Sequence, residues 1–132
     1  LKRKGFEEGA VNKVIESLAE VGLGDDEAFA RAWADERARL RPVGPRRLSR
    51  ELVEKRVSPE LASRVTDEVF TGEAELELAR RALAPRMRTS GARAGEDARS
   101  RRRRLYAFLM RRGFSYGVAA RVIEEAEGEE DV

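Results

Sequence analysis

Apolar residues recur along this chain at spacings of three and four, which is the pattern of amphipathic helices. Seven such stripes can be read: Val11 to Leu18, Phe29 to Leu40, Leu48 to Leu52, Leu61 to Val69, Leu76 to Leu83, Leu105 to Leu109 and Val118 to Ile123. The pattern therefore predicts an all-α chain of seven or eight short helices without a sheet. The large aromatic residues on these stripes, such as Trp33 and Phe108, are expected in the core.

Capping and turn residues separate the stripes. Asp25 and Ser58 stand where the N-caps of two helices are expected, and their side chains can accept backbone N–H groups. Gly113 is suited to end a helix in the left-handed conformation, and Ser115 to cap the next one. Pro85 is expected to close the helix that begins near residue 73.

One short phrase occurs three times, as LKRKGF from Leu1, LVEKRV from Leu52 and LMRRGF from Leu109, so the copies are 51 and 57 residues apart. In each copy a leucine and a basic residue would end one helix, glycine would turn the chain, and an apolar residue would pack under the turn. Arg56 replaces the glycine in the middle copy. Chance recurrence in a basic helical chain is the alternative explanation.

The spacing of the copies suits a unit of three short helices, and it predicts tandem three-helix, helix-turn-helix-like repeats. Residues 1–24 would be the remainder of a first repeat whose first helix is missing. Residues 25–72 would form the second repeat. Residues 73–132 would form the third, with a basic loop at 85–96 and an acidic tail.

Composition argues against catalysis. The chain contains no histidine and no cysteine, which removes the usual general base, the common nucleophile pairs and ordinary zinc sites. Asp25, Asp26 and Glu27 could ligate Mg²⁺, but capping and the helix dipole explain them more simply. We therefore expect no enzyme activity, no cofactor and no metal. No apolar run is long enough to span a membrane and no secretory signal is visible, so we expect a cytoplasmic protein. We also expect a monomer.

Charge is the informative feature. Charged residues make up 39% of the chain and the net charge is only +2, but eight arginines lie between Arg86 and Arg104, and six acids lie between Glu124 and Asp131. Arg104 and Arg111 are seven residues apart on one helix edge, whereas Arg112 falls under the apolar face, so its stem should snorkel. The candidate contacts to an anionic partner are Arg46, Arg47, Lys55, Arg86, Arg88, Arg93, Arg103, Arg104 and Arg111. The alternative is a solvated charged face.

The stretch GLGDDEAFARAWADERARLRPVGPRRLSRELVEKRVS and the later FLMRRGFSYGVAARVI resemble the RecX family of bacterial recombination regulators. Arg56 departs from the glycine usual in that family. The resemblance implies three tandem three-helix repeats in an elongated, curved array. It also implies binding to the RecA filament on single-stranded DNA, with modulation, mostly inhibition, of RecA recombinase, ATPase and co-protease activities in DNA repair.

Two other functions stay open at this point. One is a general nucleic-acid-binding helical module that does not depend on RecA, for which tight binding to naked DNA would be the sign. The other is a scaffold whose charges only keep it soluble, in which case nothing binds.

Overall fold

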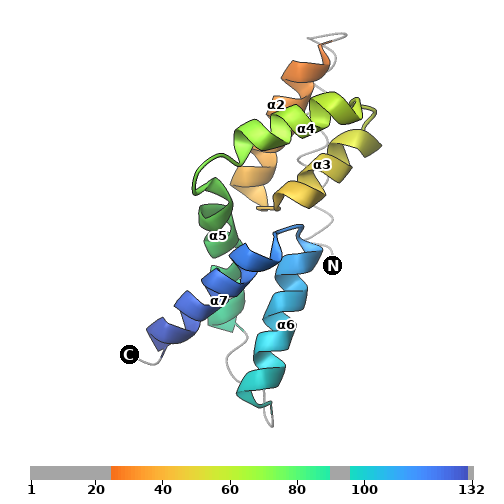
Figure 1. The fold of residues 1–132 in the computed structure, drawn as a ribbon. Helices are drawn as coiled ribbons and strands as arrows, with labels where there is room; N and C mark the ends of the chain where they lie inside the picture. Colours follow the sequence, from red (N-terminus) through yellow and green to blue (C-terminus); the bar gives the residue numbers. More distant parts are fainter. Residues whose placement is uncertain (1–24, 90–95, 131–132) are drawn as a thin grey trace.

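The computed structural model describes residues 25–89 and 96–130, and every regular element within these ranges is an α-helix (Figure 1). The elements are α2 (Asp26–Leu40), α3 (Pro45–Glu54), α4 (Pro59–Val69), α5 (Ala74–Thr89), α6 (Ala98–Arg111) and α7 (Tyr116–Glu130). The all-α prediction is confirmed. The first copy of the repeated phrase, with Gly5, and the stripe from Val11 to Leu18 lie outside the described residues, as does Arg93.

Two of the expected caps, Asp25 and Ser58, are present at the starts of α2 and α4. Asp25 Oδ1 accepts the Ala28 N–H at 3.0 Å, and Ser58 Oγ accepts the Leu61 N–H at 3.2 Å. Asp97 Oδ1 similarly accepts a backbone N–H at the start of α6, at 2.8 Å. Each carboxylate or hydroxyl satisfies a backbone donor that the first helical turn leaves without a partner.

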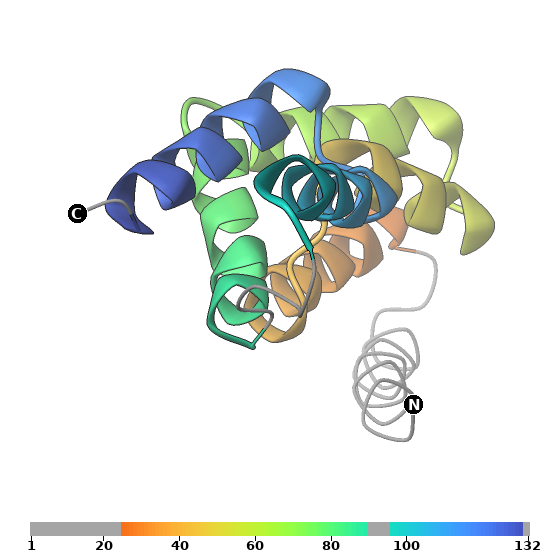
Figure 2. The same ribbon diagram turned by 90° about the horizontal axis from the view of Figure 1, so that it is seen from below.

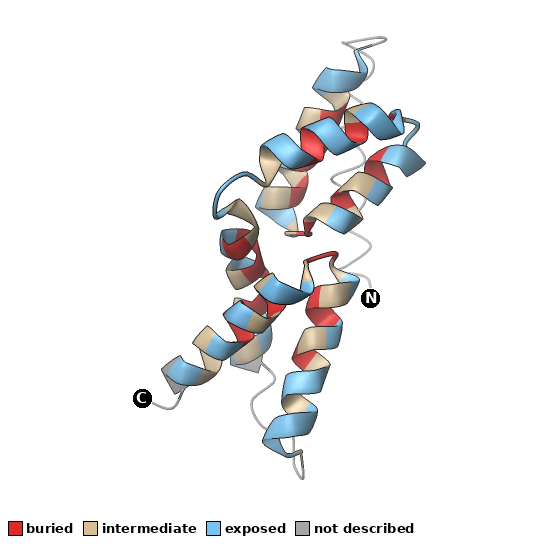
Figure 3. Ribbon diagram, in the orientation of Figure 1, coloured by how far each residue is buried: buried red, intermediate tan, exposed pale blue. Residues whose placement is uncertain are grey.

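The six helices form two three-helix units, each around its own core, in which the buried positions of neighbouring helices face one another (Figure 3). The core of α2, α3 and α4 consists of Ala30, Trp33, Ala34, Val43, Leu48, Leu52, Val57, Ala62 and Val65. The core of α5, α6 and α7 consists of Leu76, Leu78, Ala79, Ala82, Leu83, Leu105, Phe108, Leu109, Phe114, Ala119, Val122 and Ile123. Phe70 packs against both cores and links them.

The prediction that Pro85 closes a helix is wrong, because α5 continues through it to Thr89. Proline inside a helix removes one backbone hydrogen bond and costs about 3 kcal/mol or more. The continuation packs Met87 against the core and places the Arg86 guanidinium 4.3 Å from the centre of the Phe108 ring. These contacts offset the cost of the proline, and they place Arg86 and Arg88 on a helix instead of in the expected loop.

The repeated phrase is a Schellman motif at the end of α3 and again at the end of α6. Arg56 and Gly113, which align in the repeat, both have positive φ, at 72° and 89°. The hydrogen bonds also match, since Val57 N–H donates to Leu52 O at 3.0 Å and Phe114 N–H donates to Leu109 O at 3.2 Å. Leucine therefore stands three positions before the cap and a buried apolar residue stands after the turn, as this motif requires.

The two units are joined where the turn after α6 meets the loop before α3. Gly44 N–H donates to Arg112 O at 2.7 Å, and Arg46 N–H donates to Gly113 O at 3.1 Å. The backbones approach so closely that a Cβ on Gly113 would lie 2.4 Å from Arg47, and one on Gly44 would lie 2.5 Å from Gly113. We call this contact between residues 42–47 and 112–114 the inter-repeat joint.

The joint predicts that Gly113→Ala destabilises the protein by about 2–5 kcal/mol. A left-handed alanine costs roughly 1–2 kcal/mol, and the clash of its methyl group with α3 adds roughly 1–3 kcal/mol. The measurement is the free energy of unfolding in urea. Gly72→Ala is the matched control, because Gly72 also has positive φ, at 58°, but a Cβ there would meet nothing within 4 Å. Equal losses in the two variants would show that close approach at the joint is unimportant.

Candidate functional site

A buried polar cluster in the first unit holds α2 against α3. Glu51 on α3 accepts hydrogen bonds from Trp33 Nε1 at 2.9 Å and from Arg37 Nε and Nη2 at 2.9 and 2.6 Å. Arg47, one turn earlier on α3, adds a bond from its Nε at 3.0 Å. Arg37 is only 3% exposed and Glu51 is 8% exposed, so this ion pair is part of the core.

The charge on Glu51 is stabilised within this cluster. Burial alone would raise the pKa of its carboxyl group, but the hydrogen bonds and charge of Arg37, together with the bonds from Trp33 and Arg47, hold the pKa below its usual value. Arg47 was a candidate contact residue on sequence grounds. The structure instead gives it an internal carboxylate partner.

Arg112 also points inward, and the expectation that it would snorkel is wrong. Its Nη1 donates to Pro42 O at 2.9 Å across the inter-repeat joint, and its guanidinium lies 5.1 Å from the centre of the Phe108 ring. The pKa of Arg112 falls to about 10, first because of burial and then because of the positive charges of Arg41, Arg47, Arg37 and Arg86. Arg112 therefore stays charged near neutral pH, and positive charge is concentrated around the joint.

The sequence-predicted contact residues divide into two groups. Arg47, Arg86 and Arg104 contact other side chains of the protein, although Arg86 is itself exposed. Arg104 Nε and Nη2 form two bonds with Glu96, at 3.1 and 2.9 Å. Arg46, Lys55, Arg88, Arg103 and Arg111 are exposed and form no ion pair within the described ranges. Lys55 does lie over the Trp33 ring, with Nζ 5.2 Å from its centre.

Three of the exposed arginines lie on α6 or at the start of α3. Arg103 and Arg111 are on α6, and Arg46 is in the first turn of α3, which begins at the joint where α6 ends (Figure 1). Figure 2 looks nearly along α6 and shows α5 and α7 on one side of it, where they cover its apolar face. We define the basic band as Arg46, Arg103, Arg111 and the exposed Arg99.

Arg99 is a member of the band that the sequence reading missed. It lies one turn before Arg103, and residues 99, 103, 107 and 111 are all exposed. Spacing by four residues moves each side chain only about 40° around the helix, so the stripe winds slowly along α6. This spacing was visible in the sequence.

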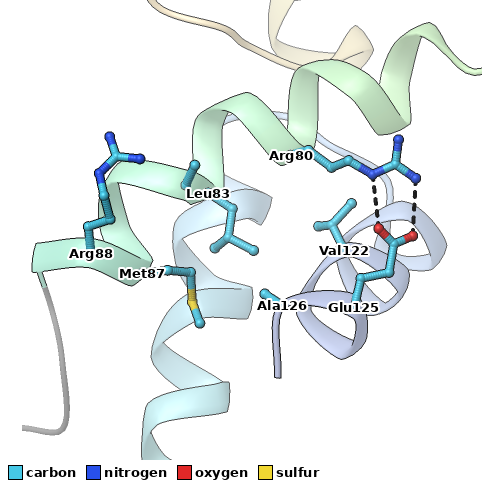
Figure 4. A pocket seen from close by; sticks show the side chains of 8 residues that line it. Arg80, Leu83, Met87, Arg88, Val122, Glu125 and Ala126 are labelled. Atoms are coloured by element: carbon cyan, nitrogen blue, oxygen red, sulfur yellow. Dashed lines mark hydrogen bonds and ion pairs between the residues drawn. The ribbon is translucent and has the colours of Figure 1, made fainter. Parts of the chain in front are cut away.

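One hollow lies between α5 and α7 and measures about 440 Å³ (Figure 4). Its walls are apolar, with Leu83, Met87, Val122 and Ala126, and Arg80 forms two bonds with Glu125 at its rim, at 2.9 and 3.1 Å. Within residues 25–89 and 96–130 no group of histidine, cysteine or acidic residues could hold a metal ion. None of the helices in these ranges is long and apolar enough to cross a membrane. We take the basic band as the candidate functional surface because its arginines are exposed and form no ion pair within the described ranges.

Comparison with known proteins links both units to one family. The second three-helix domain of RecX matches residues 25–65, and the third matches residues 73–123. The Regulatory protein RecX of Streptomyces coelicolor is 38% identical over 130 residues, covering 98% of this chain and 67% of that protein. That of Thermobifida fusca is 34% identical over 136 residues, covering 98% and 70%. No solved structure matches the chain.

The buried cluster predicts a pH-dependent loss of stability in Glu51→Gln. At neutral pH this variant should lose about 3–5 kcal/mol, because it leaves the buried Arg37 charge without its carboxylate. The pKa of Glu51 is lowered in the folded state, so its stabilising effect is full above the unfolded value, near 4.5, and is lost as pH falls through the folded pKa. The difference between the wild type and the variant should therefore shrink in acid.

Urea unfolding at neutral pH and at a pH below the folded pKa of Glu51 measures this difference. Glu54→Gln is the control, because Glu54 is an exposed carboxylate on the same helix, 3.8 Å from Arg50. Its loss should be within about 0.5 kcal/mol at both pH values. A Glu51→Gln loss that does not change with pH would contradict the assignment of the ionised form.

Proposed function

This chain belongs to the RecX family of regulatory proteins, and we propose that it binds the RecA filament on single-stranded DNA and mostly inhibits its recombinase, ATPase and co-protease activities. The observation that carries the proposal is the basic band, whose arginines are exposed and form no ion pair within residues 25–89 and 96–130. The proposal needs no catalytic group or cofactor. It assigns the protein a role in the cytoplasm, as a monomer acting in DNA repair.

A filament of protein on DNA suits this surface physically. The filament presents phosphates and acidic side chains along its length, and the band includes residues of α6 and of α3, which meet at the joint (Figure 1). Arginines that are not held by internal carboxylates can bind such groups without first breaking an ion pair. The charge of Arg112 at the joint adds to the positive potential there.

The geometry narrows the set of contact residues that we propose. Arg46, Arg103 and Arg111 are the central contacts, and Lys55 and Arg88 are peripheral ones. Arg104, Arg47 and Arg86 leave the set, because their guanidinium groups are engaged with Glu96, Glu51 and Phe108. Reversing the charge of these three would damage the fold and would not report on binding.

We predict that reversing Arg46, Arg103 and Arg111 together to Glu weakens binding to the RecA filament and relieves inhibition of its ATPase on single-stranded DNA. If all three contact phosphates, the slope of log affinity against log salt should become shallower by about two units, at roughly 0.7 for each single-strand phosphate. Filament binding by anisotropy across a salt series measures the slope, and ATP hydrolysis measures the regulation.

The control reverses three exposed arginines elsewhere, Arg64 on α4, Arg81 on α5 and Arg121 on α7, which gives the same net charge. The slope of log affinity against log salt should stay closer to the wild-type value in this control than in the band variant, because only long-range attraction changes. Circular dichroism checks that both variants fold. Wild-type affinity and inhibition in the folded band variant would refute the proposed surface, and equal losses in both variants would mean that net charge alone matters.

A further inference from the structure

Two tyrosines stack on each other between α6 and α7. The Tyr106 and Tyr116 ring centres are 5.3 Å apart and their planes differ by 19°. Tyr106 is partly covered, whereas Tyr116 is 65% exposed, the highest value among the exposed large hydrophobic side chains of the described part. Tyr106 therefore supports the Tyr116 ring from one side, and much of the Tyr116 surface stays open to solvent.

A hollow of about 210 Å³ runs beside this stack between the two helices. Tyr106, Ala120 and Ile123 form its apolar part, and Arg102, Glu124 and Glu127 form its polar part. The Nε of Arg102 lies 3.2 and 3.1 Å from the two carboxylate oxygens of Glu127. The site thus combines aromatic surface with a guanidinium group that already holds an oxyanion.

Arginines without ion pairs lie on the same side of α6. Arg99 and Arg103 precede Tyr106 by seven and three residues, spacings that place them on its face of the helix. Both are exposed and neither forms an ion pair within the described part of the chain. The basic band therefore passes along the edge of the α6–α7 hollow.

We propose that the α6–α7 hollow binds single-stranded nucleic acid directly, with one base stacked on Tyr116 and neighbouring phosphates on Arg99, Arg102 and Arg103. Aromatic rings beside cationic side chains are the usual means of binding single strands, since every base offers a flat face. A duplex fits poorly, because its bases are already stacked on one another. At Arg102 the phosphate exchanges for the carboxylate of Glu127.

The two carboxylates of the hollow oppose the binding of a phosphate, which gives a second test of this site. Glu124 and Glu127 repel a phosphate, and Glu127 competes with it for Arg102. Glu127→Gln removes one negative charge and weakens the hold on Arg102. Binding of a single strand should therefore be tighter in this variant than in the wild type.

The inference rests on the proposed function, because the bound strand would be the single-stranded DNA inside the RecA filament. The test itself uses no RecA. The probes are a short fluorescently labelled oligo(dT) and an abasic strand of the same length, which keeps the phosphates and lacks the bases. Tyr116→Ala should weaken binding of oligo(dT) roughly 5- to 150-fold, the factor expected for one lost stack. Tyr116→Phe should bind as the wild type does, and the affinity for the abasic strand should not change.

Circular dichroism checks folding, which the exposed position of Tyr116 favours. Unchanged affinity for oligo(dT) in folded Tyr116→Ala, equal weakening on both strands, or no binding of oligo(dT) by the wild type would each overturn the inference. Any of these results together with normal binding to the filament would leave the proposed function standing. If the protein did not bind the filament but Tyr116→Ala still weakened binding of oligo(dT), the proposed function would be refuted and the stacking site would stand.

Discussion

The approach of Gly44 to Gly113 is the contact on which the arrangement of the whole described chain depends. Two backbone hydrogen bonds close this joint, and there is no room for a side chain on either residue. Each three-helix unit has its own core, and this joint acts together with the contact of Phe70 with both cores to fix how the units sit. By bringing the end of α6 to the start of α3, the joint turns arginines from distant parts of the sequence into one surface.

Burial separates the arginines of this protein into two classes with different physical roles. Arg37 is buried and Arg112 is half-buried, and their removal would leave a carboxylate or a carbonyl group without a partner. Exposed pairs such as Arg64 with Glu27 stabilise little, because water and salt screen them. The arginines of the first class hold the helices and the joint together. The exposed arginines of the second class can exchange partners at small cost in free energy. The net charge of +2 hides this division.

Local features of this fold could be predicted from the sequence, and contacts between distant segments could not. The caps at Asp25 and Ser58, and the shared turn at Arg56 and Gly113, depend on residues within one helical turn. Arg56 keeps the left-handed turn without glycine because it is exposed, whereas Gly113 is pressed against α3. Arg112 reaches a carbonyl group 70 residues away, which no helical spacing can reveal.

For the same reason, the sequence predicted the helix edge of the arginines from Arg101 to Arg104 but not the carboxylate partners that two of them have. Helical spacing indicated which arginines share an edge of α6, but the partner of Arg104 is a glutamate in the loop before that helix, and the partner of Arg102 lies on α7. Arginines with a nearby carboxylate already interact with a negative group, so an outside phosphate gains only the difference between two ion pairs. Arg99 and Arg103 form no ion pair within the described residues, although Arg103 interacts electrostatically with Asp97 over a longer distance. Affinity for an anionic partner should therefore depend more on which arginines lack a carboxylate than on the length of the basic run.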